Sequence, residues 1–229
     1  KEHVNDVIDR QSELKEYIEM WCHEVKTPVA TSQMSIENKL NPVNESIKEE
    51  LIKIDNYVEQ VLFYARSENV EKDYLIKDVK LSELVNSVIK RNKKDLINKH
   101  VKIELENLEI DVASDKKWLE FILNQIINNA IKYVDETPII KLFAKQYKDR
   151  VELMIKDNGI GILENELNRV FDKGFTGTTG RTKQKSTGIG LYLCKKLCYR
   201  LNHEIKIDSN SHGTVVTLVF PYSSHITLQ

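Results

Sequence analysis

His23 and Glu24 stand next to each other, and Thr27 follows one helical turn after the histidine. A neutral imidazole is a nucleophile when one ring nitrogen is unprotonated, and a neighbouring carboxylate can hold the other nitrogen or accept its proton. At about 100° per helical residue, His23 lies about 160° from Trp21 and Val25, so it projects away from their apolar stripe. The pair could work as nucleophile and base, although the two residues alone would also suit a solvated helix surface.

Two glycine-rich stretches could hold phosphate groups. Asp157 to Gly161 (Asp-Asn-Gly-Ile-Gly) ends a strand-like run, and Thr187 to Leu191 (Thr-Gly-Ile-Gly-Leu) opens an amphipathic helix. Glycine lets the backbone approach an anion, and the amide groups of a helix N-terminus face it. Neither stretch has the Gly-Lys-Ser/Thr ending of a Walker loop or a complete dinucleotide fingerprint. Each could be an ordinary turn, but two of them around one cavity indicate a nucleotide.

A third candidate lies on the predicted helix 115–134, where Gln125, Asn129 and Lys132 or Tyr133 follow at helical spacing. Amide oxygens suit a hard cation such as Mg²⁺, which keeps several waters and takes phosphate oxygens as further ligands. A lysine would stabilise phosphates as a point charge. Without the glycine stretches, the same pattern would be read as a solvated helix face.

The elements that position these groups fall into two sets. The first 68 residues contain no glycine, and their apolar spacing predicts two long helices, with a break at residues 41–44 and Ser46 as N-cap of the second. In that second helix, the apolar positions alternate steps of four and three, which is the spacing of an a/d seam (Ile47, Leu51, Ile54, Val58, Val61 and Ala65). A lone helical hairpin buries too little apolar surface, so we expect a homodimer with a four-helix bundle.

From about residue 78 the pattern predicts an α/β sandwich with a mixed or antiparallel sheet. The expected strands are 76–80, 101–106, 110–113, 138–147, 150–157, 204–209 and 213–220, and the expected helices are 82–99, 115–134, 164–171 and 188–202. Residues 176–187 are rich in Thr, Gly, Lys and Arg and are expected to form a mobile loop. The predicted domains are 1–68, a linker 69–77, a catalytic domain 78–223 and a tail 224–229.

Composition excludes several classes. The 229 residues carry 34 Lys and Arg against 35 Asp and Glu, a net charge of −1, which argues against a nucleic-acid partner. Three cysteines form no even disulfide framework, so we expect a reducing compartment, the cytoplasm. No apolar run is long enough to span a membrane. Because the chain begins at Lys1 within a polar helical pattern, we expect an upstream segment, and any membrane anchor would lie there.

Two other groups of residues were weighed as sites. Cys194 and Cys198, with His203 nearby, could form half of a zinc site, but a structural zinc needs four ligands and this helix has its own core to fill. The apolar positions of helix 115–134 are expected to be core rather than a ligand box (Trp118, Leu119, Phe121, Ile122, Ile126 and Ile127).

In this order, the motifs resemble those of sensor histidine kinases of two-component systems. Residues 23–28 (His-Glu-Val-Lys-Thr-Pro) resemble the phosphoacceptor box, residues 124–133 the asparagine box, and residues 157–161 and 187–191 the two glycine boxes. Gly213 and the strand after it resemble the final strand of the domain. A narrower likeness, to the Gram-positive intramembrane-sensing kinases that respond to antimicrobial peptides, comes from residues 21–28 and 171–177.

The resemblance implies an ATP-binding α/β sandwich of the kind shared with gyrase and the ninety-kilodalton heat-shock chaperone. Asp157 would bind the adenine amino group, and Gly159 and Gly161 would shape the floor of the nucleotide pocket. Asn129 would be a Mg²⁺ ligand, Lys132 a phosphate contact and Tyr133 a ring close to the nucleotide. Residues 175–187 would be a lid, with Arg181, Lys183 and Lys185 as phosphate contacts, and Gly188 and Gly190 would place backbone amides at the phosphates. The other implied nucleotide-binding residues are Lys173, Gly174, Thr187 and Leu191.

The asparagine box departs from the family pattern and leaves two registers for the metal ligands. If Asn129 and Ala130 align with the usual Asn-Ala pair, the preceding ligand position holds Gln125, one methylene longer than asparagine. The other register uses Asn124 and Asn128. We prefer Gln125 and Asn129, because Lys132 and Tyr133 then take their expected places. Phe171 and Phe175 are four residues apart rather than three, which matches the narrower group.

The implied activity is ATP- and Mg²⁺-dependent autophosphorylation of His23, with Glu24 as proton acceptor, followed by transfer to an aspartate of a response regulator. Thr27 resembles the position that orients water when such kinases dephosphorylate their regulator. A membrane transporter is a further expected partner, through the upstream region. The rival interpretation is a dimeric scaffold that binds nucleotide and docks a partner without transferring phosphate.

Overall fold

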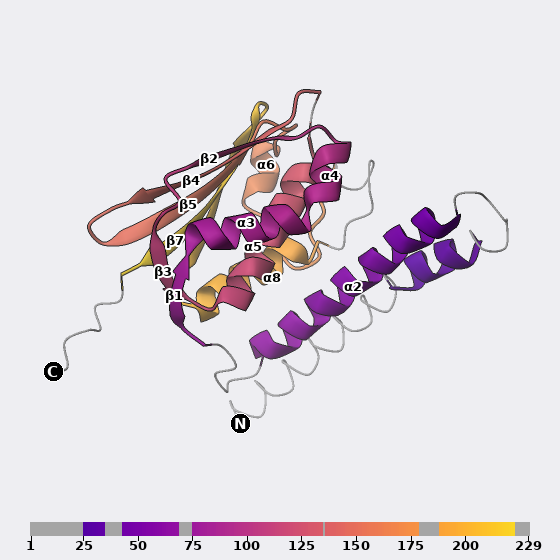
Figure 1. Ribbon diagram of the computed structural model, residues 1–229, viewed down its shortest axis with the longest axis horizontal. Helices are drawn as coiled ribbons and strands as arrows, with labels where there is room; N and C mark the ends of the chain where they lie inside the picture. The colour runs from indigo at the N-terminus through magenta and orange to yellow at the C-terminus, as the bar shows by residue number, and fades with distance from the viewer. Residues whose placement is uncertain (1–24, 35–42, 69–74, 135, 179–187, 223–229) are drawn as a thin grey trace. The chain divides into compact units, whose positions relative to one another are not determined.

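The computed structural model describes residues 25–34, 43–68, 75–134, 136–178 and 188–222 (Figure 1). The chain divides into two compact units, Lys1–Asp73 and Tyr74–Gln229. Within the described ranges, no helix has both the length and the apolar character needed to cross a membrane.

The first unit is helical where it is described. Residues 25–34 form one helical segment, and helix α2 spans Val43–Glu68. The prediction that Ser46 caps the second helix is wrong, because α2 begins three residues earlier. Nothing in Val43, Asn44 or Glu45 opposes a helix, whereas Pro42 is tolerated only at a helix start.

The second unit alternates strands and helices. In chain order it contains β1 (Lys77–Lys80), α3 (Leu81–Arg91), α4 (Lys93–Asn98), β2 (Lys102–Glu106), β3 (Asp111–Ser114), α5 (Lys116–Lys132), β4 (Ile139–Gln146), β5 (Arg150–Asp157), α6 (Glu164–Leu167), α8 (Gly190–Arg200), β6 (Glu204–Asn210) and β7 (Gly213–Pro221). Five of its strands form one sheet in the order β2-β4-β5-β7-β6. Since β2 is parallel to β4 and the other neighbours are antiparallel, the prediction of a mixed sheet is confirmed. Strands β1 and β3 form a separate antiparallel pair.

One face of the five-stranded sheet is covered by α3, α5 and α8 (Figure 1). Alternate residues of β4 and β5 are fully or almost fully buried there, among them Ile140, Leu142, Leu153 and Ile155. The apolar positions predicted as core on α5 are all buried, with at most 3% exposure (Trp118, Leu119, Phe121, Ile122, Ile126 and Ile127). The alternate residues of the strands and the apolar face of α5 therefore pack into one core between the sheet and the helices.

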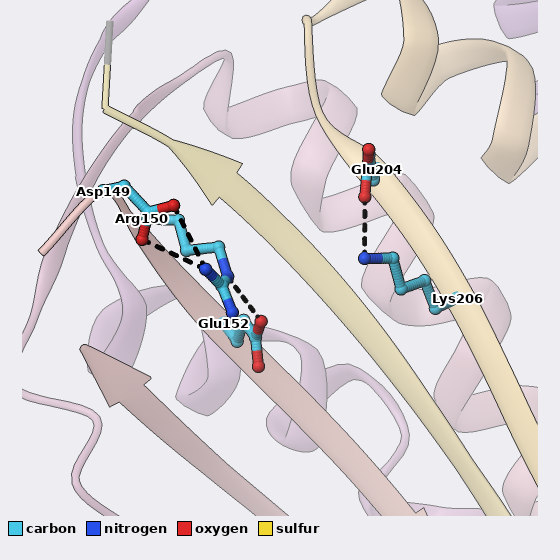
Figure 2. Close-up of polar contacts among 5 residues, drawn as sticks. All are labelled: Asp149, Arg150, Glu152, Glu204 and Lys206. Carbon is cyan, nitrogen blue, oxygen red and sulfur yellow. Dashed lines mark hydrogen bonds and ion pairs between the residues drawn. The ribbon is translucent and has the colours of Figure 1, made fainter. Parts of the chain in front are cut away.

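The opposite face of the sheet carries charged side chains (Figure 2). Arg150 donates from Nε to Glu152 Oε1 (2.7 Å) and from Nη1 to Asp149 Oδ1 (3.0 Å). On β6, Lys206 Nζ lies 2.9 Å from Glu204 Oε2, and both side chains are more than 60% exposed. Exposed pairs of this kind add little stability, so their role is to keep this face solvated.

Three predicted helices are shorter than expected. The predicted helix 82–99 is broken at Asn92 into α3 and α4, because the Asn92 backbone (φ −93°, ψ 10°) leaves the helical region. Helix α6 ends at Leu167 instead of residue 171. Helix α8 starts at Gly190 and ends at Arg200, because Gly188 and Asn202 on either side adopt positive φ (67° and 58°).

Candidate nucleotide-binding site

Asp157 ends β5 as a half-buried carboxylate with a fixed orientation. Its Oδ1 accepts hydrogen bonds from the backbone N–H groups of Gly159 (2.9 Å) and Thr214 (3.2 Å). Burial raises the pKa of this carboxyl, and the two backbone hydrogen bonds partly oppose that shift. Among the described residues, none donates a hydrogen bond to Oδ2. The second oxygen can therefore accept a hydrogen bond from a ligand.

The glycine loop after Asp157 is pressed against two neighbouring segments. Ile160 N donates to Tyr133 O (3.2 Å), and a Cβ on Gly159 would overlap that same carbonyl oxygen. Gly161 has φ +68°, and a Cβ there would overlap the carbonyl oxygen of Asn210. The loop thus joins the C-terminal end of α5 to the turn between β6 and β7.

Three positioning residues around this loop were not identified from the sequence. Asn158 Oδ1 accepts from Ile139 N (2.7 Å), which anchors the loop to β4. Ser209 Oγ accepts from Ile162 N (2.9 Å) and lies 2.8 Å from Thr214 Oγ1. The third residue is Thr214, whose N–H donates to Asp157, 57 residues earlier in the chain. No local sequence pattern predicts contacts between segments this far apart.

The amide-bearing face of α5 is turned toward the start of α8. Gln125, Asn129, Lys132 and Tyr133 are all half-buried. A Cβ on Gly190 would lie 2.9 Å from Gln125 Oε1, so this side-chain amide contacts the first turn of α8. In contrast, Asn124 is only 3% exposed and its Oδ1 accepts a hydrogen bond from Asn92 Nδ2 (2.8 Å). This geometry favours the register with Gln125 and Asn129.

The start of α8 presents backbone amides behind an apolar N-cap residue, Ile189. The N-cap residue Ile189 makes no side-chain hydrogen bond to the helix, and Leu191 is half-buried in the first turn. Gly174 N donates to Gly188 O (3.2 Å), which joins this turn to the segment containing Lys173. Lys173 is half-buried and Gly174 is exposed. Uncapped amides at a helix N-terminus favour an anion.

The described part of the predicted lid is residues 175–178. Thr178 donates from both its N–H and its Oγ1 to Glu166 Oε1, at 2.9 Å each. The Arg169 guanidinium lies 4.7 Å from the Phe175 ring centroid and Lys195 Nζ lies 5.3 Å from that of Phe171. The two aromatic residues are therefore each paired with a cation on a neighbouring segment.

The other predicted site residues are placed as follows. Thr27 is exposed on the helical segment 25–34, and its carbonyl accepts from Thr31 Oγ1 (3.0 Å). Six predicted residues lie outside the described ranges: His23, Glu24, Arg181, Lys183, Lys185 and Thr187.

The alternative zinc half-site is not supported. Cys194 and Cys198 are buried on α8, and burial raises the pKa of Cys198 to about 12. His203 Nε2 is hydrogen-bonded to Ser114 Oγ (2.8 Å). No group of three His, Cys, Asp or Glu side chains that could hold a metal occurs in the described part of the chain.

Comparison with known proteins agrees with this arrangement. Residues 114–224 match the family model described as histidine kinase-, DNA gyrase B- and HSP90-like ATPase. That segment starts at the end of β3 and contains α5, both glycine loops and α8.

The chain is 37% identical over 207 residues to the sensor histidine kinase YxdK of Bacillus subtilis, covering 89% of this chain and 64% of the relative. It is 36% identical over 210 residues to the sensor protein BceS of the same organism, covering 90% and 62%. The chain therefore spans less than two thirds of these curated relatives.

Among solved structures, the histidine kinase ThkA in complex with the response regulator protein TrrA shares the fold, with a TM-score of 0.70 and 18% identity over 96% of this chain and 65% of the other. With a matching ATPase model, a common fold and more than a third of its residues identical to curated sensors, the chain belongs to the sensor histidine kinase family.

Proposed function

We propose that this chain is the kinase core of a two-component sensor, which uses ATP to phosphorylate His23 and passes the phosphoryl group to an aspartate of a response regulator. The observation that carries the proposal is the Asp157 carboxylate, held on Oδ1 by two backbone amides, with no hydrogen bond to Oδ2 from another described residue. Membership of the sensor kinase family supports the same reaction.

The residues present fit an adenine nucleotide. Asp157 Oδ2 would accept the hydrogen bond of the exocyclic amino group, beside the loop of Gly159 and Gly161. The uncapped amides of Gly190 and Leu191 suit the phosphates, and Gly188 joins that turn to Lys173 and Gly174. Lys132 and Tyr133, which lie together at the end of α5 with Nζ 5.4 Å from the ring centroid, would contact phosphate and nucleotide. Arg181 and Thr187 are proposed to complete the phosphate contacts.

Gln125 and Asn129 are the proposed Mg²⁺ ligands. Their oxygens are hard donors, and Gln125 Oε1 lies against the turn that would face the phosphates. When bound, the metal ion would neutralise charge on the phosphate oxygens.

In the proposed reaction, an imidazole nitrogen of His23 forms the N–P bond as the γ-phosphorus loses its bond to ADP. The proton released from the ring passes to Glu24, so charge and atoms balance. The chain's contribution to phosphoryl transfer is positioning and charge neutralisation, which are the main requirements of this reaction class. In a separate hydrolytic reaction, Thr27 would orient the water that attacks the regulator's aspartyl phosphate and releases inorganic phosphate.

The apolar surface of α2 supports a homodimer. Leu51 and Val58, at predicted seam positions, are 53% and 39% exposed, and neighbouring Leu62 is 52% exposed. Exposed apolar side chains at heptad spacing indicate a helical partner, and a second copy would complete a four-helix bundle. Attachment to a membrane through an upstream segment, a transporter partner and the proposed domain boundaries remain predictions from the resemblance.

The test is incubation with γ-labelled ATP and Mg²⁺, followed by measurement of acid-labile, alkali-stable label on the chain. We expect label on the parent and none on His23→Gln, which keeps the nucleotide site. Asp157→Asn should lose label because it binds ATP weakly. An ATP-binding assay distinguishes this variant from His23→Gln, which binds ATP but lacks the phosphoryl acceptor. ATP binding without label in the parent would favour the nucleotide-binding scaffold instead.

A further inference from the structure

The break between α3 and α4 places two side chains against α5. Asn92, only 6% exposed, donates from Nδ2 to Asn124 Oδ1 (2.8 Å) and to Val88 O (2.9 Å). Lys99, just after α4, donates from Nζ to Ile131 O (2.7 Å). Neither Asn92 nor Lys99 has a role in the proposed reaction.

The two contacts fall on the same side of α5. Asn124 and Ile131 are seven residues apart, which is two helical turns, so they lie about 20° apart around the helix axis. Asn92 and Lys99 are also seven residues apart and flank α4. The short helix therefore holds α5 at two points, one at each end of the segment that carries the candidate metal and phosphate ligands.

The hydrogen bond between Asn92 and Asn124 fixes the rotation of α5 about its own axis. Asn124 and Gln125 differ by about 100° around the helix, so the rotation that directs Asn124 to Asn92 also directs Gln125 to Gly190. Rotation away from this position would leave the amide of Asn92 or Asn124 buried without its partner, which is costly in an apolar core. Only one rotation satisfies both amides.

We propose that Asn92 and Lys99 are positioning residues that hold α5 in the rotation required for Mg²⁺ and nucleotide binding, and that Asn124 acts through Asn92 and not as a metal ligand. This inference rests on the proposed nucleotide site. Both contacts come from residues at the ends of α4, where the chain leaves the helical conformation.

The experiment measures binding of Mg²⁺-ATP by the whole chain as a function of Mg²⁺ concentration, together with the thermal midpoint of each variant. Asn92→Ala and Asn124→Ala should each weaken ATP binding at saturating Mg²⁺ by about five- to tenfold, and the double variant should be no weaker than the single ones. The Mg²⁺ concentration at half-saturation should rise by the same factor in all three, because each variant releases the same rotation of α5. Gln125→Ala, at the next position, should raise that concentration while leaving ATP binding at saturating Mg²⁺ close to the parental value.

The thermal midpoints guard against simple unfolding, because only variants that remain folded at the assay temperature enter the comparison. Lys99→Met removes the second contact and should weaken binding by about two- to fivefold, whereas Lys93→Met, an exposed lysine on the same short helix, should have no effect.

Two results would overturn the proposal. A shift in Mg²⁺ half-saturation for Asn124→Ala without any effect of Asn92→Ala would make Asn124 a metal ligand. Parental ATP binding by folded Asn92→Ala and Lys99→Met would make the contacts merely structural. If the parent itself fails to bind ATP, the proposed function fails first, so the two failures are distinguishable.

Discussion

The two ends of the candidate site are held in different ways. At the proposed adenine side, defined as residues 157–161 with Thr214, three residues of the loop are held by hydrogen bonds: Asp157 by the amides of Gly159 and Thr214, Asn158 by β4, and Ile160 by Tyr133. The proposed phosphate side is defined as residues 173–174 and 188–191. A backbone hydrogen bond from Gly174 N to Gly188 O (3.2 Å) joins these two segments.

This difference indicates where the site is organised in advance of ligand binding. Hydrogen bonds that orient Asp157 without a ligand reduce the ordering that an adenine base must impose. The proposed phosphate side offers the backbone amides at the start of α8 and the half-buried Lys173, and a Cβ on Gly188 there would overlap the backbone of Gly174. We expect substitutions that add a clash or remove a hydrogen bond in the loop 157–161 to change stability and binding together. Asp157→Asn and Gly174→Ala, which do neither, should change stability least.

The largest effect is expected from Gly161→Ala. Its φ of +68° disfavours any side chain, and the added Cβ would overlap the backbone oxygen of Asn210, which cannot move without displacing the β6–β7 turn. We expect a loss of at least about 3 kcal/mol in the free energy of unfolding, together with loss of ATP binding, measured by urea denaturation and by titration. A variant with parental stability would show that the adenine side is not rigid.

Asp157→Asn should separate binding from stability. The amide oxygen still accepts from Gly159 and Thr214, but the replaced Oδ2 can no longer accept from an amino group, so ATP affinity should fall about 30- to 100-fold. Because burial raises the pKa of Asp157, the stability linked to its protonation is fully present below the unfolded pKa and is lost as pH rises through the folded pKa. Above that range the asparagine variant should therefore be at least as heat-stable as the parent.

The check is a thermal midpoint series from pH 4 to pH 8 on both proteins. The difference in midpoint should grow in favour of Asp157→Asn as the pH rises. A parent that becomes relatively more stable with rising pH would mean that the two backbone hydrogen bonds outweigh burial.

Asn158→Ala tests the anchor of the adenine side on β4. Removal of the side chain leaves the Ile139 N–H and the Thr137 carbonyl without this partner, and we expect a loss of about 1–2 kcal/mol in unfolding free energy. ATP affinity should fall only severalfold, because Asp157 keeps both of its amide bonds. Unchanged stability by urea denaturation would contradict the anchoring role.

Gly174→Ala is the matched partner of Gly161→Ala and should have the smallest effect on stability. Its φ of +73° is similar, but no atom lies within 4 Å of an added Cβ, so only the backbone preference is lost, about 1 kcal/mol. Equal losses for the two glycine variants in the same urea series would remove the contrast between the two sides.

Local pattern predicted most elements of this protein, because burial on one face leaves a period of two in strands and about 3.6 in helices. The strands around β4 and β5, the core of α5 and the mixed sheet were predicted in this way. The glycine stretches and the amide face of α5 were predicted as parts of one site, and the structure brings them together through Tyr133, Gly190 and Gly188.

Contacts between distant segments decided the helix break at Asn92 and the orientation of the Asp157 carboxylate. The break at Asn92 depends on Asn124, 32 residues later, and the orientation of Asp157 depends on Thr214, 57 residues later. The sequence already favoured Gln125 over Asn124, and the structure adds that Asn124 is buried and hydrogen-bonded to Asn92. A sequence records which side chains can form such hydrogen bonds, but the fold selects the pairs, because only burial makes an unpaired amide costly.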